Sequence, residues 1–155
     1  MMNLKRVEHV AVLVDDIEKS TQFLKEILNF NYVPTIDWTV NEDLDGNPIE
    51  PYTLRVAFFK LENIVLELMQ VLDGKSFYDK FKDKVGQGIH HVCFDVDDIK
   101  EEIKNLEKIG IKVIESGKFA GSSFAYLDTE KTCGFLLELF QKRTRSRKSH
   151  MKKNK

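Results

Sequence analysis

The sequence predicts an α+β fold in which two paired βαβββ modules form curved mixed sheets around a metal cleft. The first observation is an internal repeat: residues 9–17 read HVAVLVDDI and residues 91–99 read HVCFDVDDI, identical at six of nine positions. A second repeat pairs VLELMQ at residues 65–70 with LLELFQ at residues 136–141. Because both segments recur in the same order, the two halves are expected to be copies of one structural unit.

These repeats divide the chain into four parts. We expect a first module in residues 1–72, a linker with a short helix in 73–88, a second module in 89–141 and a basic disordered tail in 142–155. Neither module is large enough to bury a sheet alone, so the two should pack together.

The first module opens with the apolar, β-rich run at residues 7–14, which predicts a buried strand. Asp15 and Asp16 end this strand and can cap a helix that begins at Ile17 and carries an apolar stripe to Leu28. The rest of the module is expected as a strand at 30–36, a loop rich in acids, proline and glycine at 37–51, and a hairpin of strands 53–60 and 64–71.

The second module repeats this plan. Asp97 and Asp98 precede a helix with Ile99 and Leu106 on its apolar face, and Gly110 is a natural stop. A flexible loop is expected at 117–123, where it could cover a substrate or hold a phosphate. Strands are expected at 111–115, 123–128 and 134–141, and the linker helix should present Phe77, Tyr78, Phe81 and Val85.

Composition excludes several classes of protein. No apolar run approaches the roughly 20 residues of a membrane span, and no signal peptide is visible. Two cysteines, Cys93 and Cys133, make no disulfide framework, so a cytoplasmic location is the default expectation. The net charge is −1, yet residues 142–155 hold eight Lys or Arg and no acid, which leaves −9 on the rest. Nucleic-acid binding would therefore rest on the tail alone.

Four residues at equivalent places in the repeats are candidate metal ligands: His9, Glu67, His91 and Glu138. Each glutamate lies in the middle of an apolar strand, where an ionised carboxylate is unfavourable unless it is paired or metal-bound. Taken singly, each histidine could be a core residue and each glutamate could bond an arginine or a backbone N–H. As a set they suit one divalent ion, with zinc, nickel, cobalt and manganese not distinguished.

Two neighbours of these candidates have other expected roles. His90 precedes His91, and strand alternation directs it to the opposite face, so we expect it to support the ligands or the fold. Cys93 shares the face of His91 and is expected on the floor of a pocket. Met69 and Phe140 share the glutamate faces and are expected to line that pocket.

The chain resembles the vicinal oxygen chelate superfamily over about residues 6–141. The segment GIHHVCFDVDDI at 88–99 is similar to methylmalonyl-CoA epimerases, and FAYLDTEKTCGFLLELFQ at 124–141 resembles many glyoxalase-like proteins. The resemblance implies that the first and last strands of each module supply the ligands. The epimerases carry a catalytic glutamate just before the third strand of the first module, where this chain has Glu50 and Pro51.

The resemblance further implies a metal-dependent isomerase, lyase or epimerase that works through a metal-stabilised enediolate or enolate. Glu138, or in second place Glu67, would be the catalytic base. The substrate would be a small thioester or hemithioacetal, and the protein would form a homodimer. The alternatives are a metal-free binding protein of the bleomycin-resistance kind and, less favoured because both modules carry ligands, an extradiol-type dioxygenase.

Overall fold

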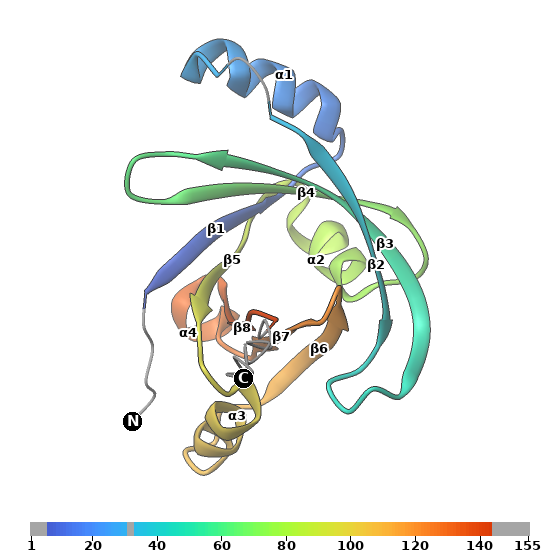
Figure 1. Cartoon of the computed structure of the whole chain (residues 1–155), viewed down its shortest axis with the longest axis vertical. Coiled ribbons are helices and arrows are strands. Elements are labelled where there is room, and N and C mark those ends of the chain that lie inside the picture. The colour runs from blue at the N-terminus through green and yellow to red at the C-terminus, as the bar shows by residue number, and fades with distance from the viewer. Residues whose placement is uncertain (1–5, 31–32, 144–155) are drawn as a thin grey trace, which may run out of the picture.

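The computed structural model describes residues 6–30 and 33–143 of the chain. The first module comprises β1 (Val7–Leu13), α1 (Ile17–Leu28), β2 (Thr35–Glu42), β3 (Pro48–Lys60) and β4 (Val65–Asp73) (Figure 1). After α2 (Phe77–Val85) come β5 (Gly88–Asp95), α3 (Ile99–Glu107), β6 (Val113–Phe119), β7 (Ser122–Leu127), α4 (Glu130–Cys133) and β8 (Leu136–Gln141). The predicted βαβββ order is confirmed in both halves, with the short helix α4 added in the second.

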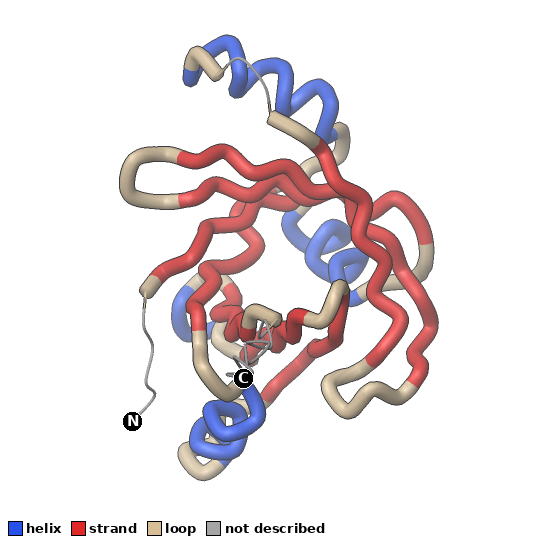
Figure 2. The backbone as a smooth tube through the Cα atoms, viewed as in Figure 1, coloured by secondary structure: helices blue, strands red, loops and turns tan. Residues whose placement is uncertain are grey.

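The eight strands close into one barrel, in the order β1-β4-β3-β2-β6-β7-β8-β5 (Figure 2). Within each module the first strand pairs in parallel with the last, β1 with β4 and β5 with β8. Between modules, β1 pairs with β5 over most of its length, and β2 meets β6 where Glu42 lies opposite Lys118. The two modules therefore pair within one chain, with their first strands side by side.

The first helix of each module lies on the outside of the barrel. The side chains of Asp16 and Asp98 accept hydrogen bonds from backbone N–H groups in the first turns of α1 and α3, as the sequence predicted. α1 packs on β3 and β4, and α3 packs on β7 and β8. Their first residues, Ile17 and Ile99, are fully buried in these two outer clusters. The inner face of the barrel is left for a third cluster and a cavity.

The predicted linker helix is confirmed as α2, and it lies against the interior of the barrel (Figure 1). Tyr78 and Phe81 are buried in the central cluster together with residues from β1, β2, β3, β4, β7 and β8. A capping box between Ser76 and Asp79 fixes its first turn. The segment that connects the modules thus also contributes to the core between them.

The boundaries predicted for the second and third strands were wrong. β2 runs over Thr35–Glu42 instead of 30–36, and β3 starts at Pro48, so most of the predicted loop at 37–51 is a hairpin. A short turn joins the two strands, in which the Asp43 side chain accepts hydrogen bonds from the backbone N–H groups of Asp45 and Asn47. One side of β2 faces solvent and carries acidic residues, and this polar composition led to the prediction of a loop.

The predicted loop at 117–123 was also wrong, because β6 and β7 form a tight hairpin through Ala120 and Gly121. Both turn residues have positive φ angles, 48° and 81°, as such turns require. Gly117 lies inside β6, where a Cβ atom would stand 2.8 Å from Val40. Glycine at this position permits close packing of β6 on β2, so it does not mark a flexible loop.

No helix in the described ranges is long and apolar enough to cross a membrane. Cys93 is buried, Cys133 is exposed, and both are free thiols. The predicted disordered tail falls mainly on residues 144–155, which lie outside the described residues.

Candidate metal site and substrate pocket

The four predicted ligands lie on four neighbouring strands. In the barrel order β4-β1-β5-β8 these strands carry Glu67, His9, His91 and Glu138. Glu67 lies opposite Ala11 across β1 and β4, and Glu138 lies opposite Cys93 across β5 and β8. Each glutamate therefore faces the position two residues after the histidine of its module, so the sequence repeat is also a repeat of strand register.

The side-chain donor atoms of these residues converge. Nε2 of His9 lies 3.0 Å from Nε2 of His91, 3.0 Å from Oε2 of Glu67 and 3.3 Å from Oε2 of Glu138. Nε2 of His91 lies 2.9 Å from Oε2 of Glu138 and 3.7 Å from Oε2 of Glu67. None of the four is more than 7% exposed. The structure thus brings the histidine and the glutamate of both modules together in one buried cluster.

This cluster fits a divalent cation. Ligands about 2.1 Å from an ion lie roughly 3.0 Å apart in octahedral and roughly 3.4 Å apart in tetrahedral geometry, close to the separations found here. Two imidazole nitrogens 3.0 Å apart can share only one proton. Oε2 of Glu138 faces Nε2 of both histidines, at 2.9 Å and 3.3 Å, so its lone pairs point to the place that a cation bound by both rings would take.

Cys93 lies beside this cluster, and its sulfur is within 4.8 Å of donor atoms of His9 and Glu138. Burial and the nearby charge of Glu138 raise the pKa of the Cys93 thiol well above its usual value. A neutral thiol is a weak ligand, because metals bind the thiolate. Cys93 was expected on the floor of a pocket, but it is not among the residues that line the cavity.

The two histidines are held by the side chain that precedes each of them. Nδ1 of His9 lies 3.0 Å from Oε2 of Glu8, and Lys142 approaches the other oxygen of Glu8 at 2.8 Å. The hydrogen bond from His9, together with Lys142, outweighs burial and lowers the pKa of Glu8 to about 2. An ionised Glu8 accepts the Nδ1–H of His9, which leaves Nε2 directed into the cluster.

In the second module, His90 precedes His91 as Glu8 precedes His9 in the first. Its Nδ1 lies 2.9 Å from Nδ1 of His91, and its ring is fully buried against Tyr78 and Phe81 of α2. Burial and the proximity of His91 lower the pKa of His90 to about 3, so this ring is neutral. His90 is expected to support the ligands, and it does contact one of them directly.

The charges of the cluster reinforce one another. Burial alone would lower the pKa of His9, but hydrogen bonds with Cys93, Glu138 and Glu67 raise it well above its usual value. Burial would likewise raise the pKa of Glu138, yet the rings of His91 and His9 lower it well below the usual range. Glu138 is therefore held as a carboxylate, the form that binds a cation and accepts a proton.

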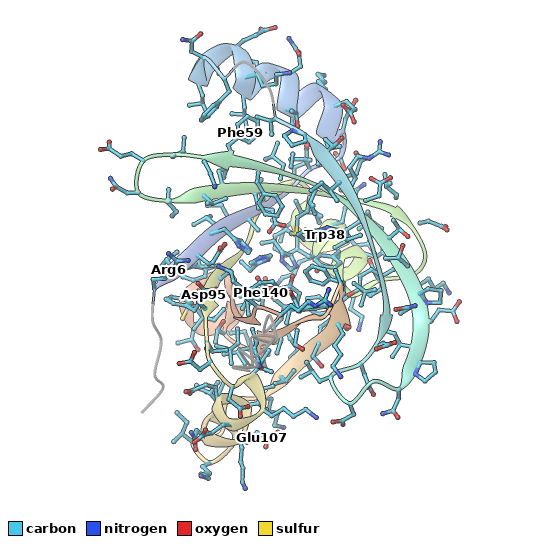
Figure 3. The ribbon with its side chains drawn as sticks, viewed as in Figure 1. Arg6, Trp38, Phe59, Asp95, Glu107 and Phe140 are labelled. Atoms are coloured by element: carbon cyan, nitrogen blue, oxygen red, sulfur yellow. The ribbon has the colours of Figure 1, made fainter. Side chains whose placement is uncertain are left out.

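A cavity of about 430 Å³ opens from this cluster. Most of its wall is apolar: Trp38, Val40, Leu54, Val56, Phe58, Val65, Met69, Tyr78, Phe119, Phe124, Tyr126 and Phe140. Trp38 of β2 stacks on Phe119 of β6, with ring centroids 4.4 Å apart, and so bridges the two modules. Figure 3 shows Trp38 and Phe140 within the ring of strands, whereas Arg6 and Asp95 lie together at its edge.

Met69 and Phe140 line the cavity, as predicted. Trp38 was missed, because its strand had been taken for a loop. The tyrosines at 78 and 126 were seen only as parts of an amphipathic helix and a strand. Glu50 is exposed on β3 and is not part of the cavity wall.

Comparison with known proteins agrees with this architecture. Over 144 residues the chain is 33% identical to the mitochondrial methylmalonyl-CoA epimerase of Bos taurus, which covers 90% of this chain and 75% of the relative. The crystal structure of methylmalonyl-CoA epimerase from Mycobacterium tuberculosis superposes with a TM-score of 0.67 at 20% identity, covering 93% of each chain. The epimerase of Streptomyces coelicolor, solved in complex with 2-nitronate-propionyl-CoA, has a TM-score of 0.64 at 17% identity, covering 92% of this chain and 100% of that one.

The family itself is identified by a direct match. Residues 8–126 fit the family described as the Glyoxalase/Bleomycin resistance protein/Dioxygenase superfamily, a range that runs from the second residue of β1 to the next-to-last residue of β7. The chain is a member of this superfamily, as the resemblance of its sequence predicted.

Proposed function

We propose that this protein is a metal-dependent epimerase, which removes the α-proton of an acyl thioester and returns a proton to the opposite face. The observation that carries this proposal is the convergence of two histidines and two glutamates, drawn from both modules, at the buried end of an apolar cavity. The similarity to named methylmalonyl-CoA epimerases over 90% of the chain supports the reaction type and the thioester.

His9, Glu67, His91 and Glu138 would hold the metal ion. When bound, a divalent ion acts as a Lewis acid that stabilises negative charge on a substrate oxygen. The protein holds its four donors on paired strands, which limits their movement, and it surrounds them with aromatic and aliphatic side chains that exclude water. Exclusion of water strengthens every charge interaction in the site.

Glu138 is the proposed base, and it would accept the α-proton at its carboxylate. Its ionised state and its place in the cavity wall are the features that suit it to this role. Epimerisation also needs a proton delivered to the other face of the α-carbon. Glu67 belongs to the other module and is the second carboxylate of the cluster, so it is the group proposed to deliver that proton. For this step Glu67 would start as the carboxylic acid and end as the carboxylate, while Glu138 changes in the opposite sense, and exchange with solvent would restore both.

A hemithioacetal of glutathione would use the same carboxylates for transfer between neighbouring carbons. Glutathione, however, presents two carboxylates, for which arginine is the fitting partner. Arg55 donates two hydrogen bonds to Asp37 on the surface, and Arg6 pairs with Asp95. These two arginines are engaged outside the cavity, and the similarity to named methylmalonyl-CoA epimerases supports the thioester as the substrate.

The proposal is tested with metal-loaded protein and one epimer of methylmalonyl-CoA in deuterium oxide. The expected result is formation of the other epimer, with solvent deuterium at the α-carbon. The hemithioacetal of methylglyoxal and glutathione serves as the parallel substrate. If the protein turns over the hemithioacetal and not the thioester, its function is that of a lyase and the proposed epimerase is wrong.

A second function, a binding protein without a metal, is favoured by one observation, the mainly apolar wall of the cavity. Binding of the thioester with unchanged affinity after chelation, and without proton exchange, would support that function. A homodimer and a cytoplasmic location remain proposals drawn from the family resemblance and the composition. Light scattering that finds only an 18.0 kDa species at high concentration would remove the dimer.

A further inference from the structure

Two buried phenols meet at the floor of the cavity. The hydroxyl oxygens of Tyr78 on α2 and Tyr126 on β7 lie 2.7 Å apart, and both residues line the cavity. Tyr78 is 1% exposed and Tyr126 is 2% exposed. This pair has two hydroxyl protons but only one mutual hydrogen bond. Within the described residues no acceptor takes the second proton, and a buried O–H without an acceptor is unfavourable.

The hydroxyl of Tyr126 is not required by packing. Tyr126 lies opposite Glu138 between β7 and β8, in the same register as Phe58 opposite Glu67 between β3 and β4. Both side chains line the cavity, so the first module fills the equivalent place with a ring that has no hydroxyl. The hydroxyl of Tyr126 is therefore present in the second module only, and its residue pairs with the proposed base, Glu138.

A phenol has a usual pKa of about 10, so both hydroxyls carry their protons near neutral pH. The ring of Tyr126 is also 4.9 Å from that of His91, between centroids, which places it beside the ligand cluster. A neutral phenol in this place is a hydrogen-bond donor.

We propose that Tyr126 is a catalytic residue that donates a hydrogen bond to the carbonyl oxygen of the thioester, while Tyr78 is a positioning residue that donates to the oxygen of Tyr126. This inference rests on the proposed function. As the α-proton leaves, negative charge develops on the carbonyl oxygen, and a donor already in place stabilises it. The proton stays on Tyr126 throughout. The bond from Tyr78 orients the hydroxyl of Tyr126 and polarises it.

Tyr126→Phe is the decisive variant, and Tyr52→Phe is its matched control. Tyr52 is a buried tyrosine whose ring packs on Tyr78 at 6.0 Å, but it does not line the cavity. In Tyr126→Phe, kcat should fall by about 10²-fold, the scale for loss of one such donor, while KM, metal content and melting temperature stay near wild type. Tyr78→Phe should lower kcat by only about 3- to 10-fold, since the donor remains but loses its partner. Tyr52→Phe should behave as wild type.

Binding gives a second readout that does not depend on turnover. A nitronate analogue of the thioester carries the charge expected on the reacting group, and propionyl-CoA does not. Titrations followed by the fluorescence of Trp38, the one tryptophan of the chain, should show at least about tenfold weaker nitronate binding in Tyr126→Phe. Propionyl-CoA binding should be unchanged.

Full kcat and full nitronate affinity in Tyr126→Phe would overturn this inference and leave the epimerase standing, because the wild type would still exchange the α-proton. A wild type that neither epimerises nor exchanges the proton would overturn the proposed function first, and the role of Tyr126 with it.

Discussion

Nε2 of His9 and Nε2 of His91 lie 3.0 Å apart although 82 positions separate the two residues in the chain. The antiparallel pairing of β1 with β5 places them there, since His9 lies opposite Cys93 and Ala11 lies opposite His91 in that ladder. One histidine from each module thus meets at the junction of the modules. The candidate metal site exists only when both modules are folded and joined.

Removal of one imidazole should therefore remove the metal. In His91→Ala, we expect the affinity for a divalent ion to fall by about 10²-fold or more, because one of four donors is lost. Elemental analysis after dialysis against a weak chelator measures this. Cys93→Ser is the control, and it should retain metal if the thiol is no ligand. Equal metal content in wild type and His91→Ala would contradict the assignment of the site.

Glu138→Gln should separate metal binding from proton transfer. The amide oxygen of glutamine can still coordinate a cation, but it cannot accept a proton. Metal content should fall only modestly, and kcat should decrease by about 10²-fold or more, as for loss of a general base. The rates of epimerisation and of solvent exchange are the measurements. Full activity in this variant would transfer the role of base to Glu67.

Gly117→Ala should destabilise the junction of β6 with β2. A Cβ at this position would lie 2.8 Å from Val40, closer than real Cβ contacts, and 3.0 Å from Phe124, which is tighter than most of them. We expect a loss of about 1–3 kcal/mol in the free energy of unfolding, typical of an overpacked core. Urea denaturation gives the value. Gly88→Ala is the matched control, because its Cβ would meet Val85 at an ordinary 3.7 Å.

Trp38 should report occupation of the cavity. Its ring stacks on Phe119 and lines the wall, so a ligand in the cavity must change its surroundings. We expect methylmalonyl-CoA to change the emission of Trp38 in metal-loaded protein, with a smaller change for free CoA, which lacks the acyl group. Trp38→Phe keeps an aromatic wall and removes the signal. An emission spectrum that does not respond at saturating thioester would place the substrate elsewhere.

The sequence by itself determined the two modules, the helices α1, α2 and α3, and the four candidate ligands. Each of these has a local signature: a repeated segment, an aspartate before an apolar stripe, or a glutamate inside an apolar strand. Such signatures depend on neighbours along the chain, so they can be read without knowing what lies across the barrel. The repeat then related His9 to His91 and Glu67 to Glu138.

Only the tertiary structure decided which other side chains share the site. Trp38 lies on a half-exposed strand whose acidic neighbours resemble a loop, and it reaches the cavity because β2 closes the barrel onto β6. Tyr78 and Tyr126 are 48 positions apart, and each has a common apolar pattern in its own element. Their hydroxyls meet because α2 lies against the inner face of the barrel. That meeting depends on long-range packing, for which neither segment carries a local signal.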